Sequence, residues 1–212
     1  MRIVLLGAPG SGKGTQAKFI AKRYRIPIIS TGEILRKLIQ NDTLISKKIK
    51  YTIHNGKLIS DNIVTTLVKN SISKINCDSG FVLDGFPRTI SQAQIIKKEK
   101  ILINYIFELK IPNEMILKRV QKRRMNSILE TIDGNIEDKN QSLKSTNYKN
   151  ITHRYDDNEL IINTRLEEYK KFTIPLINYF NKSSIIKKIK FYTIDGTKTI
   201  SEINEEIKNI LD

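Results

Sequence analysis

Met1-Arg-Ile-Val-Leu-Leu-Gly-Ala-Pro-Gly-Ser-Gly-Lys-Gly-Thr15 sets the architecture of this chain. The run Ile3–Leu6 is apolar and rich in branched residues, which is typical of a strand buried on both faces of a parallel sheet. The glycine-rich segment that follows places Lys13 directly after Gly12. In such a loop, backbone N–H groups converge on phosphate oxygens at the positive start of the next helix, here expected over Thr15–Tyr24. The sequence therefore predicts a phosphate-binding loop, with Lys13 as the charge for the outer phosphates.

This loop departs at one residue from the general pattern. Gly14 follows Lys13, so the hydroxyl that often holds Mg²⁺ arrives one residue later, at Thr15. The segment Gly-Ala-Pro-Gly-Ser-Gly-Lys-Gly-Thr-Gln resembles the loop of nucleoside monophosphate kinases, and of the adenylate kinase family above all. The resemblance implies that Mg²⁺ is held largely through water and phosphate. It also implies that the donor, ATP, is bound by Gly10, Ser11, Gly12, Lys13, Gly14 and Thr15.

The composition indicates one globular domain with insertions. The chain has 212 residues, 39% of them hydrophobic, and contains no internal repeat. No basic and apolar leader precedes the first strand, and no apolar run reaches membrane-spanning length, so we expect a cytoplasmic protein without a membrane partner. Cys77 is the single cysteine. This excludes a disulfide within the chain and a zinc site built from cysteines.

The formal net charge of +15 raises the question of a polyanionic partner. The lysine pairs are spread over the whole length, at Lys47-Lys48, Lys97-Lys98, Lys170-Lys171 and Lys187-Lys188. No aromatic and basic platform for stacking bases accompanies them. A genome rich in A and T favours Ile, Lys and Asn codons and explains the charge at least as well. We therefore expect no nucleic-acid partner, although the charge would speed the capture of anionic nucleotides.

The segment Ser30-Thr-Gly-Glu33 has the form of a capping box and predicts a helix over Ile34–Ile39. Extended to Arg36, it is similar to the segment that opens the nucleoside monophosphate-binding insert of adenylate kinases. The resemblance implies that Thr31 faces the base of the acceptor, AMP, and that Arg36 binds its phosphate. It places this insert at residues 30–59, which would close around the adenine through Lys57, Leu58 and Ile59.

A second motif, Phe81-Val-Leu-Asp-Gly-Phe-Pro-Arg88, begins as an apolar strand and ends in a carboxylate. Parallel sheets present their binding crevice at the carboxyl ends of the strands, so Asp84 stands where an acid orients Mg²⁺-bound water. Arg88 has a planar guanidinium suited to phosphate. The amide of Gln92 can pair with adenine as both donor and acceptor. The resemblance assigns to the acceptor site Gly85, Phe86, Pro87, Arg88 and Gln92.

A further strand is expected at Tyr105–Leu109, followed by a helix over Pro112–Arg124 with its proline in the tolerated first turn. Arg119 and Arg123 lie four residues apart and so share one face of this helix. Alone, such a pair usually marks a solvated face. The resemblance implies that Arg119 stacks on the donor adenine and that Arg123 reaches the donor phosphates.

The resemblance is weakest over the lid insert, residues 122–157. Residues 124–153 are polar, rich in Asn and Lys and poorly periodic, which is typical of an excursion from the core. The motifs and metal ligands of long-lid relatives do not occur in this segment. Counting without gaps places two donor contacts at Ile132 and Asp133. The departure bears on donor choice rather than on the reaction class.

The match resumes at Arg154-Tyr-Asp-Asp157 and continues along a helix that contains Arg165. The resemblance implies that Arg154 and Arg165 bridge the donor and acceptor phosphates. Asp156 and Asp157 would pair with these arginines or bind Mg²⁺ through water.

The last strand is expected at Lys190–Ile194. Asp195-Gly-Thr-Lys198 then resembles the loop that touches the donor adenine, so Lys198 completes the donor set. Thr199-Ile-Ser-Glu202 predicts a second capping box at the start of the final helix.

These motifs predict an α/β protein with the three-layer P-loop fold. The resemblance implies a five-stranded parallel sheet flanked by helices, with two mobile inserts. The core is expected at residues 1–29, 60–121 and 158–212.

The resemblance implies a monomeric enzyme that catalyses ATP + AMP ⇌ 2 ADP with Mg²⁺. Acid–base chemistry is little needed, because the work is to hold donor and acceptor in line and to neutralise phosphoryl charge. The residues expected to do so, with Arg36 beside them, are Lys13, Asp84, Arg88, Arg123, Arg154 and Arg165.

Other functions stay open on the sequence alone. One is a kinase for another nucleoside monophosphate, or an AMP kinase that uses GTP. The other is a basic nucleic-acid-binding protein that kept the fold without catalysis. Thr31 and Gln92 favour AMP as the acceptor, and the intact pair Lys13 and Asp84 favours an enzyme.

Overall fold

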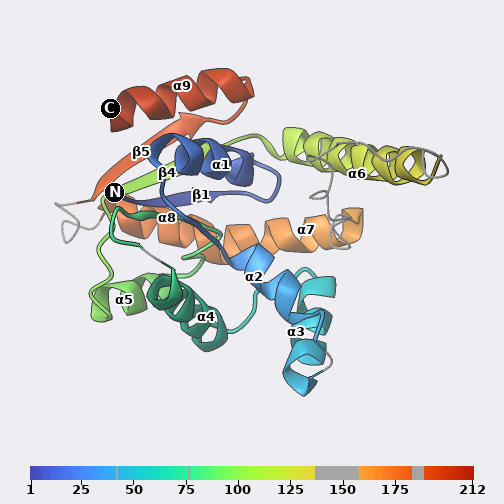
Figure 1. Ribbon diagram of the computed structural model, residues 1–212, viewed down its shortest axis with the longest axis horizontal. Coiled ribbons are helices and arrows are strands. Elements are labelled where there is room, and N and C mark those ends of the chain that lie inside the picture. The colour runs from blue at the N-terminus through green and yellow to red at the C-terminus, as the bar shows by residue number, and fades with distance from the viewer. Residues whose placement is uncertain (42, 76, 137–157, 183–188) are drawn as a thin grey trace, which may run out of the picture.

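The computed structural model describes residues 1–41, 43–75, 77–136, 158–182 and 189–212, with residues 126–136 and 182 described by their backbone alone. The strands are β1 (Arg2–Gly7), β2 (Ile28–Ser30), β3 (Phe81–Asp84), β4 (Tyr105–Lys110) and β5 (Lys190–Asp195). They form one parallel sheet in the order β2-β3-β1-β4-β5. Figure 1 labels β1, β4 and β5 of this sheet. The predicted five-stranded parallel sheet is confirmed.

Helices connect these strands throughout the described part of the chain. They are α1 (Lys13–Tyr24), α2 (Thr31–Leu38), α3 (Leu44–His54), α4 (Asp61–Lys74), α5 (Ile90–Lys98), α6 (Asn113–Ile136), α7 (Glu159–Glu168), α8 (Ile174–Lys182) and α9 (Ile200–Leu211). A π-helical turn, η1 (Tyr169–Thr173), joins α7 to α8. No helix among the described residues is long and apolar enough to span a membrane.

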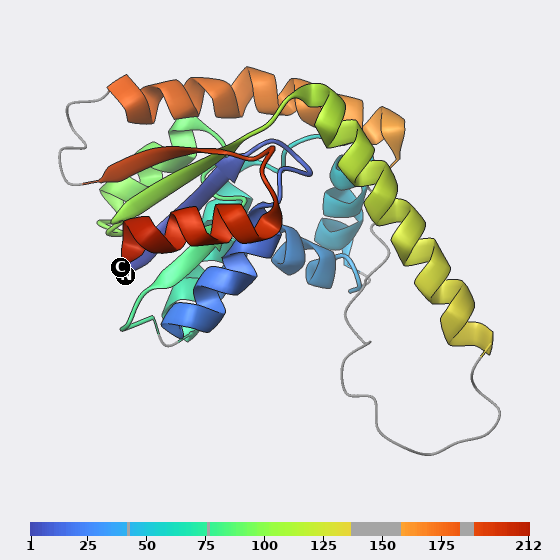
Figure 2. The same ribbon diagram turned by 90° about the horizontal axis from the view of Figure 1, so that it is seen from above.

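The central strand β1 faces two helical layers with alternate residues. Ile3 and Leu5 belong to a cluster with residues of α1 and α9, whereas Val4 and Leu6 belong to one with residues of α4, α5 and α8. Figure 2 shows α8 on one side of the sheet and α1 and α9 on the other. All four side chains are at most 2% exposed, and burying each contributes about 1.5–3 kcal/mol. This explains why the strand reads as an unbroken apolar run.

The order of the strands creates a crevice at their carboxyl ends. The chain leaves β1, adds β2 and β3 on one side of it, and then adds β4 and β5 on the other. Loops at such a switch point diverge and leave room for a ligand. The predicted phosphate-binding loop follows β1 directly, and Asp84 is the last residue of the neighbouring β3.

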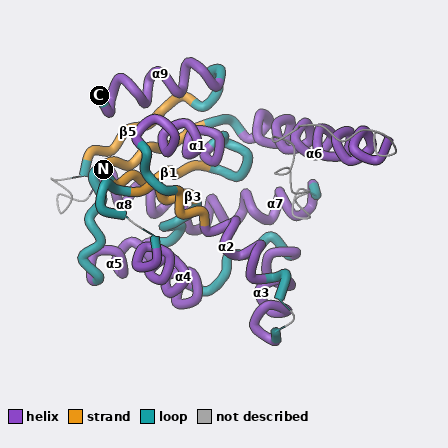
Figure 3. Tube along the Cα trace, viewed as in Figure 1, coloured by secondary structure: helices purple, strands orange, loops and turns teal. Residues whose placement is uncertain are grey.

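One helix is longer than the sequence indicates. We expect an end at Arg124, but α6 continues to Ile136. No proline or glycine interrupts the sequence between Pro112 and Gly134, so nothing local stops the helix. In Figures 1 and 2, α6 projects away from the sheet, and α2 and α3 project from another part of the molecule (Figure 3).

Candidate active site

The phosphate-binding loop joins β1 to α1, and its own backbone hydrogen bonds hold its shape. Gly12 is the N-cap residue of α1 and has a φ of 99°, a left-handed conformation that favours glycine. The N–H of Ser11 donates to the carbonyl of Ala8 at 3.2 Å, and the N–H of Gln16 donates to the carbonyl of Gly12 at 3.1 Å. The loop thus ends at the positive N-terminus of α1, as predicted.

Lys13 folds back over this loop. Its Nζ donates to the carbonyl oxygens of Gly7 and Ala8, each at 2.7 Å, and to Ser11 Oγ at 3.3 Å. These neutral acceptors hold the ammonium group in place without neutralising it. These bonds place the Lys13 amine directly beside the phosphate-binding loop.

One carboxylate and three arginines act on Lys13 through their charges. Burial lowers the pKa of Lys13 to about 7; Asp84 opposes this shift, and Arg88, Arg165 and Arg123 add to it. The structure thus gathers four of the predicted cations close enough to influence one another. A polyanion bound among them would offset their repulsion and favour the charged form of Lys13.

Asp84 lies at the carboxyl end of β3, in register with Leu5 on one side and Ser30 on the other. Ser30 Oγ donates to Asp84 Oδ2 at 3.4 Å. A Cβ atom at Gly14 would lie 3.6 Å from the same oxygen, so the phosphate-binding loop faces the acid. A single carboxylate beside this loop fits Mg²⁺, which is usually bound by one or two carboxylates with phosphate and water. Across the described ranges, no cluster of three or more His, Cys, Asp or Glu could hold a metal by itself.

A cavity opens beside the loop and contains most of the acceptor residues predicted from the sequence. The predicted residues on its wall are Lys13, Thr31, Arg36, Lys57, Leu58, Ile59, Gly85, Pro87, Arg88, Gln92 and Arg165. Its apolar wall includes Leu35, Ile53, Val64 and Tyr169, which the sequence reasoning missed. Phe86 is 1% exposed and packs in the core instead.

The turn after β3 needs a glycine. Gly85 has a φ of 82°, and a Cβ there would lie 2.7 Å from Thr31 Oγ1 and 2.9 Å from Arg88 Nη2. Both side chains instead bond to this turn, because Thr31 Oγ1 and Arg88 Nε donate to the Gly85 carbonyl at 3.0 and 2.9 Å. The close packing of Gly85 thus orients the hydroxyl and the guanidinium of the predicted acceptor site.

The π-helical turn η1 and the end of α7 support the same cavity. Thr173 Oγ1 donates to the carbonyl of Arg88 at 3.1 Å, and the N–H of Leu58 donates to Glu168 Oε2 at 3.1 Å. Burial, with a smaller contribution from Glu108, raises the pKa of Tyr169 to about 12. The sequence predicts one long helix here, and nothing in its pattern signals a π-turn, which is a feature common at functional sites.

Gln92 lines the cavity and belongs to a hydrogen-bonded group. Its Oε1 accepts the N–H of Arg88 at 2.7 Å, and its Nε2 donates to Asp61 Oδ1 at 2.7 Å. Thr89 Oγ1 donates to the other carboxylate oxygen, Asp61 Oδ2, at 3.0 Å. Asp61 thus holds both the Gln92 amide and the Thr89 hydroxyl.

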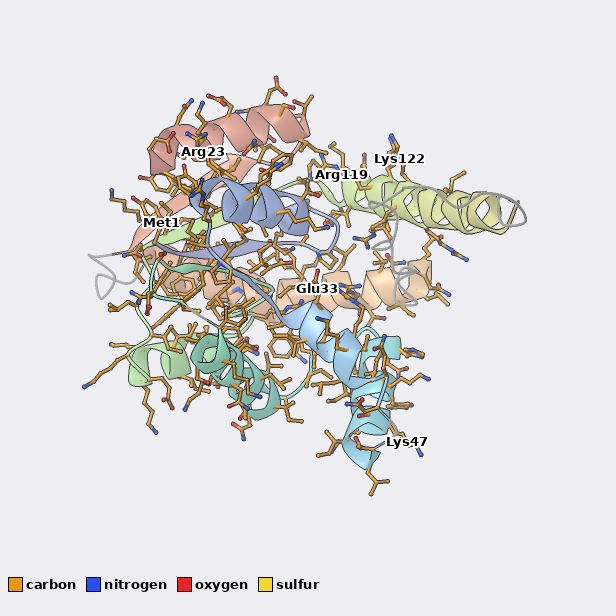
Figure 4. The ribbon with its side chains drawn as sticks, viewed as in Figure 1. Met1, Arg23, Glu33, Lys47, Arg119 and Lys122 are labelled. Atoms are coloured by element: carbon orange, nitrogen blue, oxygen red, sulfur yellow. The ribbon has the colours of Figure 1, made fainter. Side chains whose placement is uncertain are left out.

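The predicted donor residues Arg119 and Lys198 make different contacts. Arg119, labelled at the start of α6 in Figure 4, donates to the carbonyls of Gly196 at 2.7 Å and Ser11 at 3.4 Å. It thereby ties the phosphate-binding loop to the loop after β5. Lys198 Nζ pairs with Glu206 Oε2 at 2.8 Å on the surface, and this hydrogen bond raises the pKa of Lys198.

Several predicted residues lie outside the described part of the chain. These are Arg154, Asp156 and Asp157, together with most of the segment expected to form the lid. Ile132 and Asp133 belong to the backbone of α6, but their side chains are not described. Their assignments stay predictions.

Comparison with known proteins identifies the family of the chain. The family model described as adenylate kinase matches residues 5–185. Over its full length the chain is 44% identical to an adenylate kinase of Buchnera aphidicola subsp. Baizongia pistaciae and covers 99% of that protein. It is 43% identical to one of Photorhabdus laumondii subsp. laumondii, with 100% of both chains covered. The chain belongs to the adenylate kinase family.

Proposed function

We propose that this chain transfers the terminal phosphoryl group of ATP to AMP, reversibly and with Mg²⁺, to give two molecules of ADP. The observation that carries the proposal is the convergence of Lys13, Arg36, Arg88 and Arg165, from separate segments, on one cavity beside the phosphate-binding loop. Membership of the adenylate kinase family supports the same reaction. Phosphoryl transfer is catalysed mainly by positioning and charge neutralisation, which such a cluster supplies.

AMP would occupy the cavity with its phosphate among Arg36, Arg88 and Arg165. Its base would lie between the apolar wall and Gln92, whose amide offers one donor and one acceptor to the edge of adenine. Thr31 is buried and bonded to Gly85, so its role would be to shape the turn under the base. Lys57, Leu58 and Ile59 would cover the adenine from the insert.

ATP would bind with its phosphates on the loop from Gly10 to Thr15. Lys13 would hold the outer phosphates, and Arg123 would neutralise charge on the transferred group, with Arg154 as a further candidate. Arg119 would lie beside the donor base while it braces the loop through the Ser11 carbonyl. Asp84 would hold Mg²⁺ through its water shell, and the bound ion would supply charge neutralisation at the phosphates.

Residues 30–59 and 122–157 would act as two inserts that close over the substrates and exclude water. Sequestration of this kind suppresses hydrolysis of ATP. The contacts from Glu168 to Leu58 and from Thr173 to Arg88 would anchor the first insert and the Arg88 turn to the core. We expect a monomer in the cytoplasm, which gel filtration and cell fractionation would test.

The experiment that tests this function is a coupled assay of ADP formation. The purified chain would receive ATP and Mg²⁺ with each of AMP, CMP, UMP and GMP, and AMP with GTP as the donor. Activity confined to AMP and ATP is the expected result. If the chain prefers another acceptor, or GTP as the donor, that nucleotide takes the place of AMP or ATP in the proposed reaction. If the folded protein is inactive on every pair of nucleotides, the proposed reaction is wrong. The alternative of a nucleic-acid-binding protein is then favoured.

A further inference from the structure

Gln92 is held at both ends of its amide by partners that cannot exchange roles. The backbone N–H of Arg88 can only donate, and it donates to Oε1 at 2.7 Å. The carboxylate of Asp61 can only accept, and it accepts from Nε2 at 2.7 Å. A flipped amide would place its NH₂ group against the N–H of Arg88, which are both donors. It would also place its oxygen against the carboxylate of Asp61, which are both acceptors. The amide therefore has a single stable orientation.

The carboxylate is itself held by a third group. Thr89 Oγ1 donates to Asp61 Oδ2 at 3.0 Å and accepts the N–H of Gln92 at 3.1 Å as the N-cap of α5. Gln92 is 2% exposed, so these bonds lie where water does not compete for them. Among the described residues that line the cavity, Gln92 is included and Asp61 is not. Asp61 thus reaches the cavity through Gln92, which it binds directly.

We propose that Asp61 is a positioning residue that fixes the Gln92 amide in the orientation that selects a 6-aminopurine acceptor over a 6-oxopurine acceptor. This inference rests on the proposed function, with the acceptor base in this cavity. After its two protein bonds, the amide keeps one N–H and one carbonyl lone pair. Adenine presents an acceptor at N1 and a donor at its 6-amino group, which match this remaining pair.

A 6-oxopurine presents the opposite pattern. Hypoxanthine carries a donor at N1 and an acceptor at O6. Its N1–H would therefore face the amide N–H, and its O6 would face the amide oxygen, unless the amide flips. Asp61 and the Arg88 N–H oppose that flip. IMP is the sharpest probe, because it differs from AMP only in the groups at positions 1 and 6 of the base.

The test is a double-mutant cycle between Asp61→Ala and Gln92→Ala, read as KM and kcat for AMP and as the inhibition constant of IMP against AMP. We expect Asp61→Ala to raise KM for AMP by about tenfold and to reduce the preference for AMP over IMP by a similar factor. The KM for ATP should stay within about twofold, because the donor site is separate. In the Gln92→Ala background, Asp61→Ala should add less than about twofold.

Two variants separate this role from a structural one. Asp61 also lies in the first turn of α4, where its charge favours the helix dipole. Asp61→Asn removes that charge but keeps an oxygen that can accept from Gln92 Nε2, so it should restore most of the AMP preference. Glu114→Gln, which removes an exposed charge from the first turn of α6, should leave the preference unchanged.

The outcomes distinguish this inference from the proposed function. If the wild-type chain fails to phosphorylate AMP, the proposed function falls and this inference falls with it. If the wild-type chain is active, additive effects of Asp61→Ala and Gln92→Ala overturn this inference alone. An unchanged ratio of AMP to IMP binding in folded Asp61→Ala protein, judged by its circular dichroism, overturns it as well.

Discussion

The starts of α2 and α9 carry the same local pattern and form different structures. At α9, Thr199 Oγ1 accepts the N–H of Glu202 at 3.3 Å, and Glu202 Oε2 accepts the N–H of Thr199 at 2.9 Å, so the predicted capping box is present. At α2, the side chain of Ser30 makes no capping bond, and its hydroxyl donates to Asp84 instead. The capping box predicted at Ser30 and Glu33 is wrong.

The difference follows from what surrounds each helix start. Thr199 and Glu202 are exposed, and their side chains bond to each other and to each other's backbone N–H groups. Ser30 and its neighbour Thr31 are buried against the end of β3, where Asp84 and the Gly85 carbonyl accept their hydroxyl groups. On the surface, the hydroxyl of this pattern caps its own helix. Beside the crevice, the hydroxyl of the same pattern bonds to Asp84, a residue of the candidate site.

The largest contrast is between two arginines. Arg88→Ala should lower kcat by more than about a hundredfold, because a preorganised cation that stabilises the transferring phosphoryl group is lost. Arg23→Ala should leave kcat unchanged, since Arg23 pairs with Asp212 on the outer surface. Steady-state assays of both variants measure the contrast. An Arg88→Ala enzyme within about threefold of wild type would remove its assigned role.

The next contrast is between two lysines and concerns pH. The pKa of Lys13 is lowered by burial to about 7, and bound phosphates favour its charged form. Nucleotide binding above this pH therefore requires proton uptake, and affinity should fall by up to about tenfold per pH unit. Calorimetry at pH 8 in two buffers of different ionisation enthalpy measures the uptake, which Lys13→Met should abolish.

Lys198 is the control for this experiment. Its ion pair with Glu206 raises its pKa, so it stays charged through the neutral range. Lys198→Met should therefore keep the proton uptake of the wild type. Uptake that survives in Lys13→Met would show that another group takes the proton.

The same pKa shift predicts a trend in the stability of the unliganded chain. The pKa of Lys13 in the folded state, about 7, lies below its value of 10.5 in the unfolded chain. Between these values the unfolded state binds more protons, so the contribution of Lys13 to stability rises with pH. Urea unfolding between pH 7 and pH 9 should show a smaller rise in Lys13→Met than in the wild type.

The smallest contrast returns to the two helix starts. Thr199→Ala should lower the free energy of unfolding by about 1 kcal/mol, because a formed N-cap is lost, and should leave activity unchanged. Ser30→Ala should change the free energy of unfolding by less than about 0.5 kcal/mol, because no cap bond is present to lose and the bond to Asp84, at 3.4 Å, is long and therefore weak. Denaturant unfolding of both variants compares them. Equal losses would mean that Ser30 caps α2 after all.

The sequence predicts the parts of the fold and site that depend on neighbouring residues. The strand at Ile3–Leu6, the loop that ends in Lys13 and the turn at Gly85 each follow from short-range patterns of apolar residues and glycines. The π-turn at Tyr169 does not, because irregular turns depend on packing. The end of α6 was also missed, since no proline or glycine stops the helix at Arg124. A motif also does not show which of its side chains face a cavity. Gly85 and Pro87 line the cavity, but the side chain of Phe86 between them packs in the core.

The sequence by itself determined the strand–loop–helix unit, the parallel sheet and the identity of the charged groups, because these depend on periodicity, glycine conformation and residue type. Only the tertiary structure decided which partner each polar group takes. Ser30 turns to Asp84, Thr173 to the Arg88 carbonyl, and Asp61 to Gln92. The physical reason is that a buried hydrogen-bonding group must be satisfied by whichever partner the fold places beside it, and that partner lies far away along the chain.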